Sequence, residues 1–236
     1  MKGSFYGVGV GPGDPELITV KAVKLINEAE VLLLPASQKS ECRAYNIARA
    51  AVSDIDNKDC IFSPFPMTMD KAALEKFHLD TAKMVEAYLE RGKNVAFLTI
   101  GDPCIYSTFE YIEKLISKRG YKTQYISGVT SFCASAARVG ESLAQGKEEI
   151  HIIPGLQAIE EALKLNGTKV FMKSGKQLEK LKEHLINNGK TYNYDVFSVS
   201  NCGMDSEVIC KGAGNIPVDA GYLTVVVVKE HKDESE

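Results

Sequence analysis

Residues 5–15 read FYGVGVGPGDP, a short apolar run that passes into a loop of glycines and prolines. An apolar run bounded by turn residues is typical of a buried strand. The glycines indicate that the loop backbone approaches another group closely, although a tight structural turn would also use them. Pro12 and Pro15 each fix one φ angle and stiffen the loop. The stretch therefore predicts the first strand–loop–helix unit of an α/β fold.

The loop does not match a dinucleotide-binding fingerprint. The pattern G-x-G-x-x-G would need glycine at position 12 or 14, where the chain has Pro12 and Asp14. The second predicted strand, residues 31–34, is followed by Pro35 and not by an acidic residue. Both observations argue against NAD binding.

Strands and helices alternate along most of the chain, which predicts an α/β fold. We expect strands at residues 6–10, 31–34, 61–62, 95–100, 123–126, 150–153 and 170–172. We expect helices at residues 40–52, 106–116, 130–139, 156–165 and 177–186. Two further helices should begin after the N-cap residues Thr19 and Asp70. The last strands, at 195–199, 207–210 and 222–228, have no helix between them, which favours antiparallel pairing there.

The pattern restarts near Arg119–Lys122, so we expect two α/β lobes. Residues 1–119 would form the N-terminal lobe, and residues 120–236 would form a C-terminal lobe with a mixed sheet. A cleft between two lobes is a common place for a ligand site.

Composition excludes several classes of protein. The 236 residues carry a net charge of −3, which argues against a dedicated nucleic-acid binder. No apolar run approaches the roughly 20 residues needed to span a bilayer. The histidines and six cysteines show no metal-ligand spacing and no C-x-x-C pair, so we expect reduced thiols and no metal site. The opening residues lack a signal-peptide pattern, and we expect a cytoplasmic protein.

Two further strand–loop–helix segments could carry chemistry. Residues 98–108, LTIGDPCIYST, follow the fourth strand, where ligands bind in open α/β sheets. Asp102 could hold an ammonium or a hydroxyl group there, or it could simply cap a helix. Residues 126–133, ISGVTSFC, include small and hydroxyl-bearing side chains that would let a ligand lie near the backbone, but such side chains also suit a closely packed helix.

Taken in order, these strings resemble the tetrapyrrole (corrin/porphyrin) methylase family. The shared motifs are G-x-G-P-G-D-P at residues 9–15, G-D-P-x-x-Y at 101–106 and G-x-T-S at 128–131. The resemblance covers nearly the whole chain and implies two α/β lobes, S-adenosylmethionine bound between them, and a homodimer. The strings FPMTMD at 65–70 and FLTIGDPCIYST at 97–108 are most similar to members that methylate precorrin-2 or cobalt-precorrin-2 at meso carbon C-20.

The resemblance also implies which residues face the cofactor. The matching positions are Pro12, Ile100, Gly101, Asp102, Ile105, Tyr106, Thr130, Ser131, Met172, Asn201 and Cys202. The chain departs from the family pattern at Ser200, where relatives often have an acidic residue, and at Ser127, where proline is usual.

The implied reaction is direct methyl transfer, which needs no protein nucleophile, and we assign no catalytic residue. Tyr106 is a candidate for orienting the reactants. The tetrapyrrole substrate is rich in carboxylates, and the candidate partners for them are Lys39, Arg43, Arg138 and Lys173. A solvated surface role is the simpler alternative for each of these cations.

Two other functions stay open at this point. A methylase of the same fold could act on another tetrapyrrole position or on a macromolecule, but the net charge and the string YST at 106–108 argue against a macromolecular acceptor. A non-catalytic tetrapyrrole-binding protein is the alternative of another class. In each hypothesis that involves a tetrapyrrole, we expect the partner to be a small molecule and not a nucleic acid or a membrane.

Overall fold

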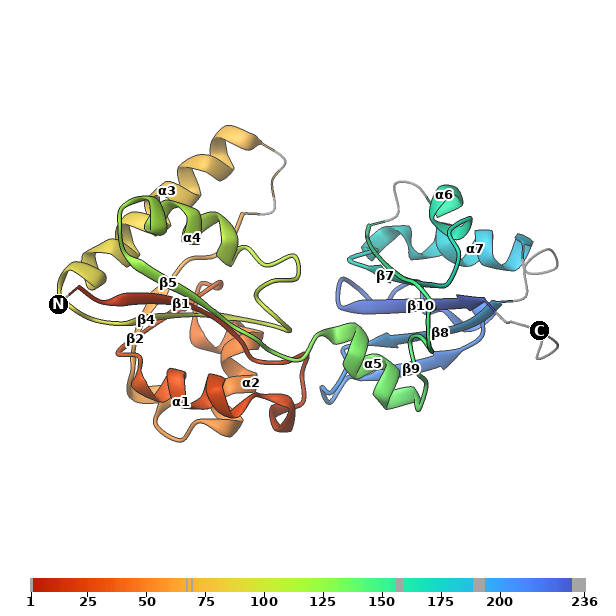
Figure 1. The fold of residues 1–236 in the computed structure, drawn as a ribbon, viewed down its shortest axis with the longest axis horizontal. Coiled ribbons are helices and arrows are strands. Elements are labelled where there is room, and N and C mark those ends of the chain that lie inside the picture. Colours follow the sequence, from red (N-terminus) through yellow and green to blue (C-terminus); the bar gives the residue numbers. More distant parts are fainter. Residues whose placement is uncertain (1, 67, 69, 156–158, 189–193, 231–236) are drawn as a thin grey trace. The chain divides into compact units, whose positions relative to one another are not determined.

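The computed structural model describes residues 2–66, 68, 70–155, 159–188 and 194–230. The chain divides into two compact units, Met1–Thr130 and Ser131–Glu236 (Figure 1). The sequence pattern predicts a division between residues 119 and 120. In the structure the division lies later, because the strand at Lys122–Ile126 hydrogen-bonds to the first strand and completes the first sheet.

The first unit contains a five-stranded sheet in the order β3-β2-β4-β1-β5. Its strands are β1 Ser4–Gly9, β2 Val31–Leu34, β3 Asp59–Phe62, β4 Val95–Thr99 and β5 Lys122–Ile126. All neighbouring pairs are parallel, so every strand ends at the same edge of the sheet. The α/β fold is thereby confirmed. The loops after β4, β1 and β5 follow three adjacent strands and must lie close together.

Helices cover both faces of this sheet (Figure 1). They are α1 Val20–Glu28, α2 Arg43–Ala51, α3 Lys71–Glu90 and α4 Phe109–Lys118, with short 3₁₀ helices at Pro15–Leu17, Lys39–Glu41 and Ile55–Asn57. The two predicted caps are confirmed. Thr19 Oγ1 accepts the Ala22 N–H at 3.2 Å, and Asp70 Oδ1 accepts the Ala72 N–H at 2.9 Å.

The helix predicted at 106–116 begins later, at Phe109. Tyr106 has a φ of +51°, which is incompatible with a right-handed helix, and residues 103–108 therefore form a loop. Two methionines of the string FPMTMD, Met67 and Met69, lie outside the described residues, and so does the start of the helix predicted at 156–165.

The core of the first unit explains one glycine of the opening motif. A Cβ at Gly7 would lie 2.4 Å from the ring of Phe109, which is fully buried. The Phe109 ring also packs against Phe5, with ring centroids 5.0 Å apart, and against Tyr125 at 4.8 Å. The absence of a side chain at Gly7 thus lets α4 pack against the sheet, and this packing accounts for the glycine without a ligand.

The second unit contains a mixed five-stranded sheet in the order β6-β7-β10-β8-β9. Its strands are β6 Ile150–Pro154, β7 Thr168–Met172, β8 Tyr194–Ser200, β9 Val208–Lys211 and β10 Thr224–Glu230. Its helices are α5 Ser131–Val139, α6 Ile159–Leu163 and α7 Leu178–Asn188, with 3₁₀ helices at Gly175–Gln177 and Ala213–Asn215. The antiparallel pairing predicted for the last three strands is confirmed.

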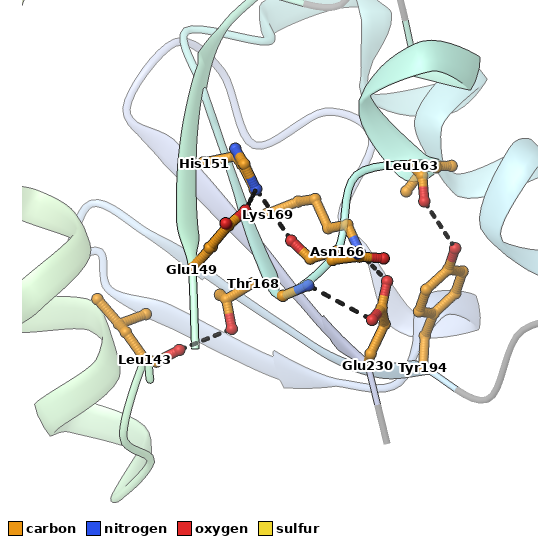
Figure 2. A network of polar contacts seen from close by, with 10 residues as sticks. Leu143, Glu149, His151, Leu163, Asn166, Thr168, Lys169, Tyr194 and Glu230 are labelled. Carbon is orange, nitrogen blue, oxygen red and sulfur yellow. Dashed lines mark hydrogen bonds and ion pairs between the residues drawn. The ribbon is translucent and has the colours of Figure 1, made fainter. Parts of the chain in front are cut away.

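A buried lysine anchors the end of the second sheet (Figure 2). Lys169 on β7 is fully buried, and its Nζ lies 2.5 Å from Glu230 Oε1 at the end of β10. The same Nζ lies 5.5 Å from the ring centroid of Tyr194, the first residue of β8. The Tyr194 hydroxyl in turn donates to the Leu163 carbonyl at 3.1 Å. These contacts tie β7, β10, β8 and α6 together.

We expect Glu230→Gln to lower the free energy of unfolding by about 2 kcal/mol, because Lys169 would lose its anionic partner while remaining buried. Breaking a fully buried pair costs roughly 3–5 kcal/mol, and the effect is smaller here because a third of the Glu230 side chain is exposed. Urea unfolding measures the change. Glu110→Gln, which breaks the exposed Lys114–Glu110 pair on α4, should cost less than about 0.5 kcal/mol. Equal effects of the two substitutions would contradict the anchoring role.

Candidate functional site

Three loops meet backbone to backbone at the carboxyl edge of the first sheet. Gly11, after β1, and Gly101, after β4, form an isolated antiparallel bridge. The Gly101 N–H donates to the Gly11 carbonyl at 2.8 Å, and the Gly11 N–H donates to the Gly101 carbonyl at 3.3 Å. The opening motif and the G-D-P motif are therefore parts of one local structure.

Glycine is required where these loops cross. A Cβ at Gly128, in the loop after β5, would lie 2.1 Å from the Gly101 carbonyl oxygen and 2.9 Å from the Gly9 backbone. A Cβ at Gly9 would lie 2.5 Å from the same oxygen. The close approach predicted from the glycines is thus an approach to the protein's own backbone at these two positions.

Gly101 differs from its neighbours. Its φ is +71°, and a Cβ there would meet only the Val129 carbonyl oxygen, at 3.9 Å. On that side there is room beside the Gly101 main chain, although the residue as a whole is buried. Such room at the carboxyl edge of a parallel sheet is a suitable place for a ligand to rest.

Asp102 joins two of these loops. The residue is buried; its Oδ1 accepts the Cys104 N–H at 2.7 Å and its Oδ2 accepts the Gly128 N–H at 2.9 Å. The helix-cap alternative is wrong, because α4 starts at Phe109, several residues further on. Asp102 instead closes the turn after Gly101 and fastens it to the loop after β5. Partial burial raises the pKa of the Cys104 thiol, and the neighbouring Asp102 carboxylate acts in the same direction.

Backbone strain marks the predicted site residues in both units. Among the described residues, the non-glycine residues with positive φ are Tyr106 at +51°, Lys173 at +55° and Asn201 at +50°. Each of the three follows the carboxyl end of a strand: β4, β7 or β8. Asparagine tolerates this conformation, but tyrosine and lysine rarely adopt it, and such strain concentrates at functional sites. Tyr106 and Asn201 are also positions that the family resemblance implies for the cofactor, and Lys173 is one of the candidate cations for the substrate.

The second unit also gathers its predicted residues at one sheet edge. Strands β7 and β8 are both antiparallel to β10, so they run in the same direction and end at the same edge. Met172 ends β7, and its carbonyl accepts the Gly155 N–H at 2.8 Å. Asn201 follows β8, and its N–H donates to the Leu223 carbonyl at 2.9 Å. Lys173 Nζ lies 5.8 Å from the Tyr222 ring centroid.

The remaining predicted cofactor residues take ordinary places on these loops. Pro12 is buried in the loop after β1, Ile105 is half-buried beside the exposed Tyr106, and Ile100 directly follows β4. Thr130 ends the first unit and Ser131 begins the second. The Thr130 Oγ1 is buried and has no hydrogen-bond partner among the described residues.

Arg138, a predicted substrate-binding residue, holds a carboxylate of the protein itself. Its Nε lies 3.0 Å and its Nη2 lies 2.6 Å from Glu207 Oε1, which is a two-point contact. Hydrogen bonding to Arg138 holds the pKa of the Glu207 carboxyl below its ordinary value, and the Gly203 N–H acts in the same direction. Glu207 could not be found from local sequence patterns, because 69 positions separate it from its partner.

The charge on Glu207 should stabilise the fold in a pH-dependent way. Because the folded pKa is lowered, the contribution is fully present above the ordinary carboxyl pKa and is lost as the pH falls through the lowered value. We expect Glu207→Gln to lower the free energy of unfolding by about 1–2 kcal/mol at neutral pH. The difference from the wild type should shrink at pH 4, as urea unfolding at both pH values can show. A difference that stays constant with pH would contradict this account.

The predicted cations of the first unit also have internal partners. Lys39 Nζ donates to the Asp56 carbonyl at 2.7 Å and lies 5.4 Å from the Tyr45 ring centroid. Arg49, on α2, pairs with Asp56 Oδ2 at 2.9 Å. Arg43 is exposed at the first residue of α2. These contacts make Arg43 a better candidate than Lys39 for an external anion.

No three or more histidine, cysteine, aspartate or glutamate side chains among the described residues are grouped so as to hold a metal ion. None of the helices in this part of the chain combines the length and the apolar character needed to cross a membrane.

Comparison with known families and proteins gives consistent matches. The sequence model of the Tetrapyrrole (Corrin/Porphyrin) Methylases matches residues 4–215. A Methanocaldococcus jannaschii protein named probable cobalt-precorrin-2 C(20)-methyltransferase is 32% identical over 96% of each chain. The precorrin-2 C(20)-methyltransferase of a Sinorhizobium species is 31% identical over 98% of this chain and 97% of its own.

Solved structures match the fold over nearly the full length. The cobalt precorrin-4 methyltransferase CbiF gives a TM-score of 0.75 at 20% identity and covers 96% of this chain and 94% of its own. The Thermus thermophilus uroporphyrin-III C-methyltransferase, complexed with S-adenosylhomocysteine, gives 0.67 at 18% identity, with 97% and 98% covered. At this level of identity, the likeness concerns the fold.

Proposed function

The chain belongs to the tetrapyrrole (corrin/porphyrin) methylase family, and from this premise we propose that it methylates precorrin-2 or cobalt-precorrin-2 at meso carbon C-20, using S-adenosylmethionine, in cobalamin biosynthesis. The observation that carries the proposal is the identity of 31–32%, over at least 96% of the chain, to two relatives named for this C-20 reaction. One relative is named for precorrin-2 and the other for cobalt-precorrin-2, at nearly equal identity. Precorrin-2 and cobalt-precorrin-2 are therefore the two substrates to compare.

The described residues fit S-adenosylmethionine. A Cβ at Gly101 would meet no close neighbour, so there is room beside this residue at the edge where the site is proposed, and Thr130 offers a buried hydroxyl that has no partner among those residues. When bound, S-adenosylmethionine supplies a methyl group that its positively charged sulfur has already activated. A site for it needs backbone polar groups and shaped apolar walls more than a nucleophile or a metal, and these loops provide such groups.

We assign the cofactor contacts to residues of each unit. In the first unit, Ile100, Gly101 and Asp102 would hold the methionine part, with Pro12, Ile105 and Tyr106 beside them and Thr130 at the end of the unit. In the second unit, Ser131 would face the cofactor, while Met172, Asn201 and Cys202 would frame the adenosine. The strained conformations of Tyr106 and Asn201 support their inclusion.

The chain's part in the reaction is to position the reactants. Holding reacting atoms in line and in contact can lower a barrier by about 7–11 kcal/mol, which makes positioning the main contribution here. Asp102 supports that task by joining two of the loops, because both oxygens of its carboxylate accept backbone hydrogen bonds. Tyr106 is the candidate for orienting the acceptor, being 43% exposed next to that turn.

The substrate carboxylates would bind to cations on these surfaces. Arg43 is a better candidate than Lys39 or Arg138, because those two already hold oxygen atoms of the protein, and Lys173 is a further candidate. We further propose that the protein acts as a homodimer in the cytoplasm, as the family resemblance implies. Size-exclusion chromatography with light scattering tests the dimer separately from the activity.

The activity is tested by anaerobic incubation with S-adenosylmethionine and, in separate tubes, precorrin-2 and cobalt-precorrin-2. We expect the mass of the pigment in one tube to rise by one methyl group, and carbon-13 NMR with a labelled methyl donor to place that group at C-20. The tube that reacts identifies the pathway.

No mass gain in either tube, while S-adenosylhomocysteine still binds, would exclude the C-20 assignment and direct attention to other ring positions or a macromolecular acceptor. A protein that binds tetrapyrrole but not S-adenosylhomocysteine would be a non-catalytic binder.

A further inference from the structure

The turn that follows β8 is held in a strained shape. Asn201 has a φ of +50° and Gly203 a φ of +75°. The Met204 N–H donates to the Asn201 carbonyl at 3.0 Å, which closes the turn around the buried Cys202. Residues with positive φ have easily reached alternatives in the extended region, so such a turn needs outside support to keep one conformation.

Glu207 provides that support from the other end of the loop. Its Oε2 accepts the Gly203 N–H at 2.6 Å, directly after Cys202. Its Oε1 lies 3.0 Å from Arg138 Nε and 2.6 Å from Arg138 Nη2, on α5. The Glu207 side chain is only 12% exposed, whereas that of Arg138 is 53% exposed. One carboxylate thus connects a helix to the peptide that fixes the turn.

We propose that Glu207, held by Arg138, is a positioning residue that keeps the Asn201–Gly203 turn in the conformation that binds the adenosine of S-adenosylmethionine. This inference rests on the proposed function, because it assigns a role to a residue outside the predicted contact set. Glu207 need not touch the cofactor, since it acts through the Gly203 amide.

The affinity for the cofactor depends on the fraction of molecules whose Asn201–Gly203 turn is in the binding conformation. When only a fraction of molecules holds the binding conformation, the apparent dissociation constant rises by the inverse of that fraction. A hydrogen bond to a charged group is strong enough for its loss to change an equilibrium by about ten- to a hundredfold. Removing the carboxylate should therefore weaken cofactor binding even though no cofactor contact is removed.

The first experiment compares S-adenosylhomocysteine binding by calorimetry in the wild type, Glu207→Ala and Glu207→Gln. We expect Glu207→Ala to bind about ten- to a hundredfold more weakly. Glu207→Gln should lose less, because its amide oxygen can still accept the Gly203 N–H. The matched control is Glu141→Ala, which breaks the exposed Lys211–Glu141 pair in the same unit and should leave the affinity unchanged.

A charge swap separates positioning from simple stabilisation. Arg138→Glu combined with Glu207→Arg can restore an ion pair between α5 and the loop, but arginine cannot accept the Gly203 N–H. We expect the swap to recover thermal stability relative to Arg138→Glu alone while binding stays weak. The amide proton of Gly203 in a ¹⁵N–¹H spectrum gives a readout without cofactor, and it should move upfield in Glu207→Ala and in the swap.

The outcomes are distinct. Wild-type affinity in Glu207→Ala, or full recovery of affinity in the swap, would overturn the positioning role while leaving the proposed function intact. A loss of affinity in Glu141→Ala as large as that in Glu207→Ala would also overturn it, because the effect would then be general. A wild type that does not bind S-adenosylhomocysteine would overturn the proposed function and this inference together.

Discussion

Gly128→Ala is expected to abolish S-adenosylhomocysteine binding and to lower the free energy of unfolding by about 3 kcal/mol or more. The added Cβ would lie 2.1 Å from the Gly101 carbonyl oxygen and 2.9 Å from the Gly9 backbone. Overpacking costs about 1–3 kcal/mol when flexible side chains can move aside, and more when they cannot. Here all the neighbours are main chain, so three loops would have to shift together.

Gly120→Ala is the matched control in the same unit. Its φ is +81°, but a Cβ there would meet nothing within 4 Å. The substitution should cost only the strain of a left-handed alanine, roughly 1–2 kcal/mol, and should leave cofactor affinity unchanged. Urea unfolding and calorimetry measure both quantities. If Gly128→Ala behaved like Gly120→Ala, the three loops would not be packed as described.

The sequence was sufficient to predict the layers of the fold and the sheet edge at which the site is proposed. Alternating strands and helices imply a parallel sheet, and strand ends followed by glycine loops mark its carboxyl edge. The predictions that needed correction depend on long-range contacts. The unit boundary lies after residue 130 because β5 pairs with β1, and strand order is not visible in local periodicity.

The roles of single residues were harder to predict for the same reason. The glycines at positions 7, 9 and 128 look alike in the sequence, yet the first accommodates the Phe109 ring and the other two accommodate backbone. The sequence predicts Arg138 as a candidate for the substrate carboxylates, because its partner Glu207 is distant along the chain and its ion pair is not visible there. The family resemblance implies cofactor roles for Tyr106 and Asn201, and Lys173 is a candidate cation for the substrate; the structure adds that these three share a positive φ.

Asp102→Ala is expected to lower the free energy of unfolding by about 3 kcal/mol and to weaken S-adenosylhomocysteine binding more than about a hundredfold. The carboxylate is buried and accepts backbone N–H groups from Cys104 and Gly128. Hydrogen bonds to a charged group are worth about 1.5–3 kcal/mol each. Alanine would leave both amides without this acceptor and would release the turn after Gly101 from the loop after β5.

Asp102→Asn sharpens the test, because its side-chain amide has one acceptor oxygen while its NH₂ group can only donate. Two backbone donors then compete for one acceptor, so asparagine should fall between alanine and the wild type in stability and in affinity. Asp70→Ala is the control. Asp70 also accepts two backbone N–H groups, but at the exposed start of α3, where the loss should be about 1 kcal/mol without a change in affinity.

The order of the Asp102 variants distinguishes fastening from direct cofactor contact. If Asp102 only fastened the loops, affinity and stability would fall together from the wild type through asparagine to alanine. If its charge instead bound the cofactor directly, asparagine would lose as much affinity as alanine while keeping most of the stability. Wild-type affinity in both variants would remove Asp102 from the site, and the rigidity of the three loops would then have to come from the Gly11–Gly101 bridge and the glycine crossings alone.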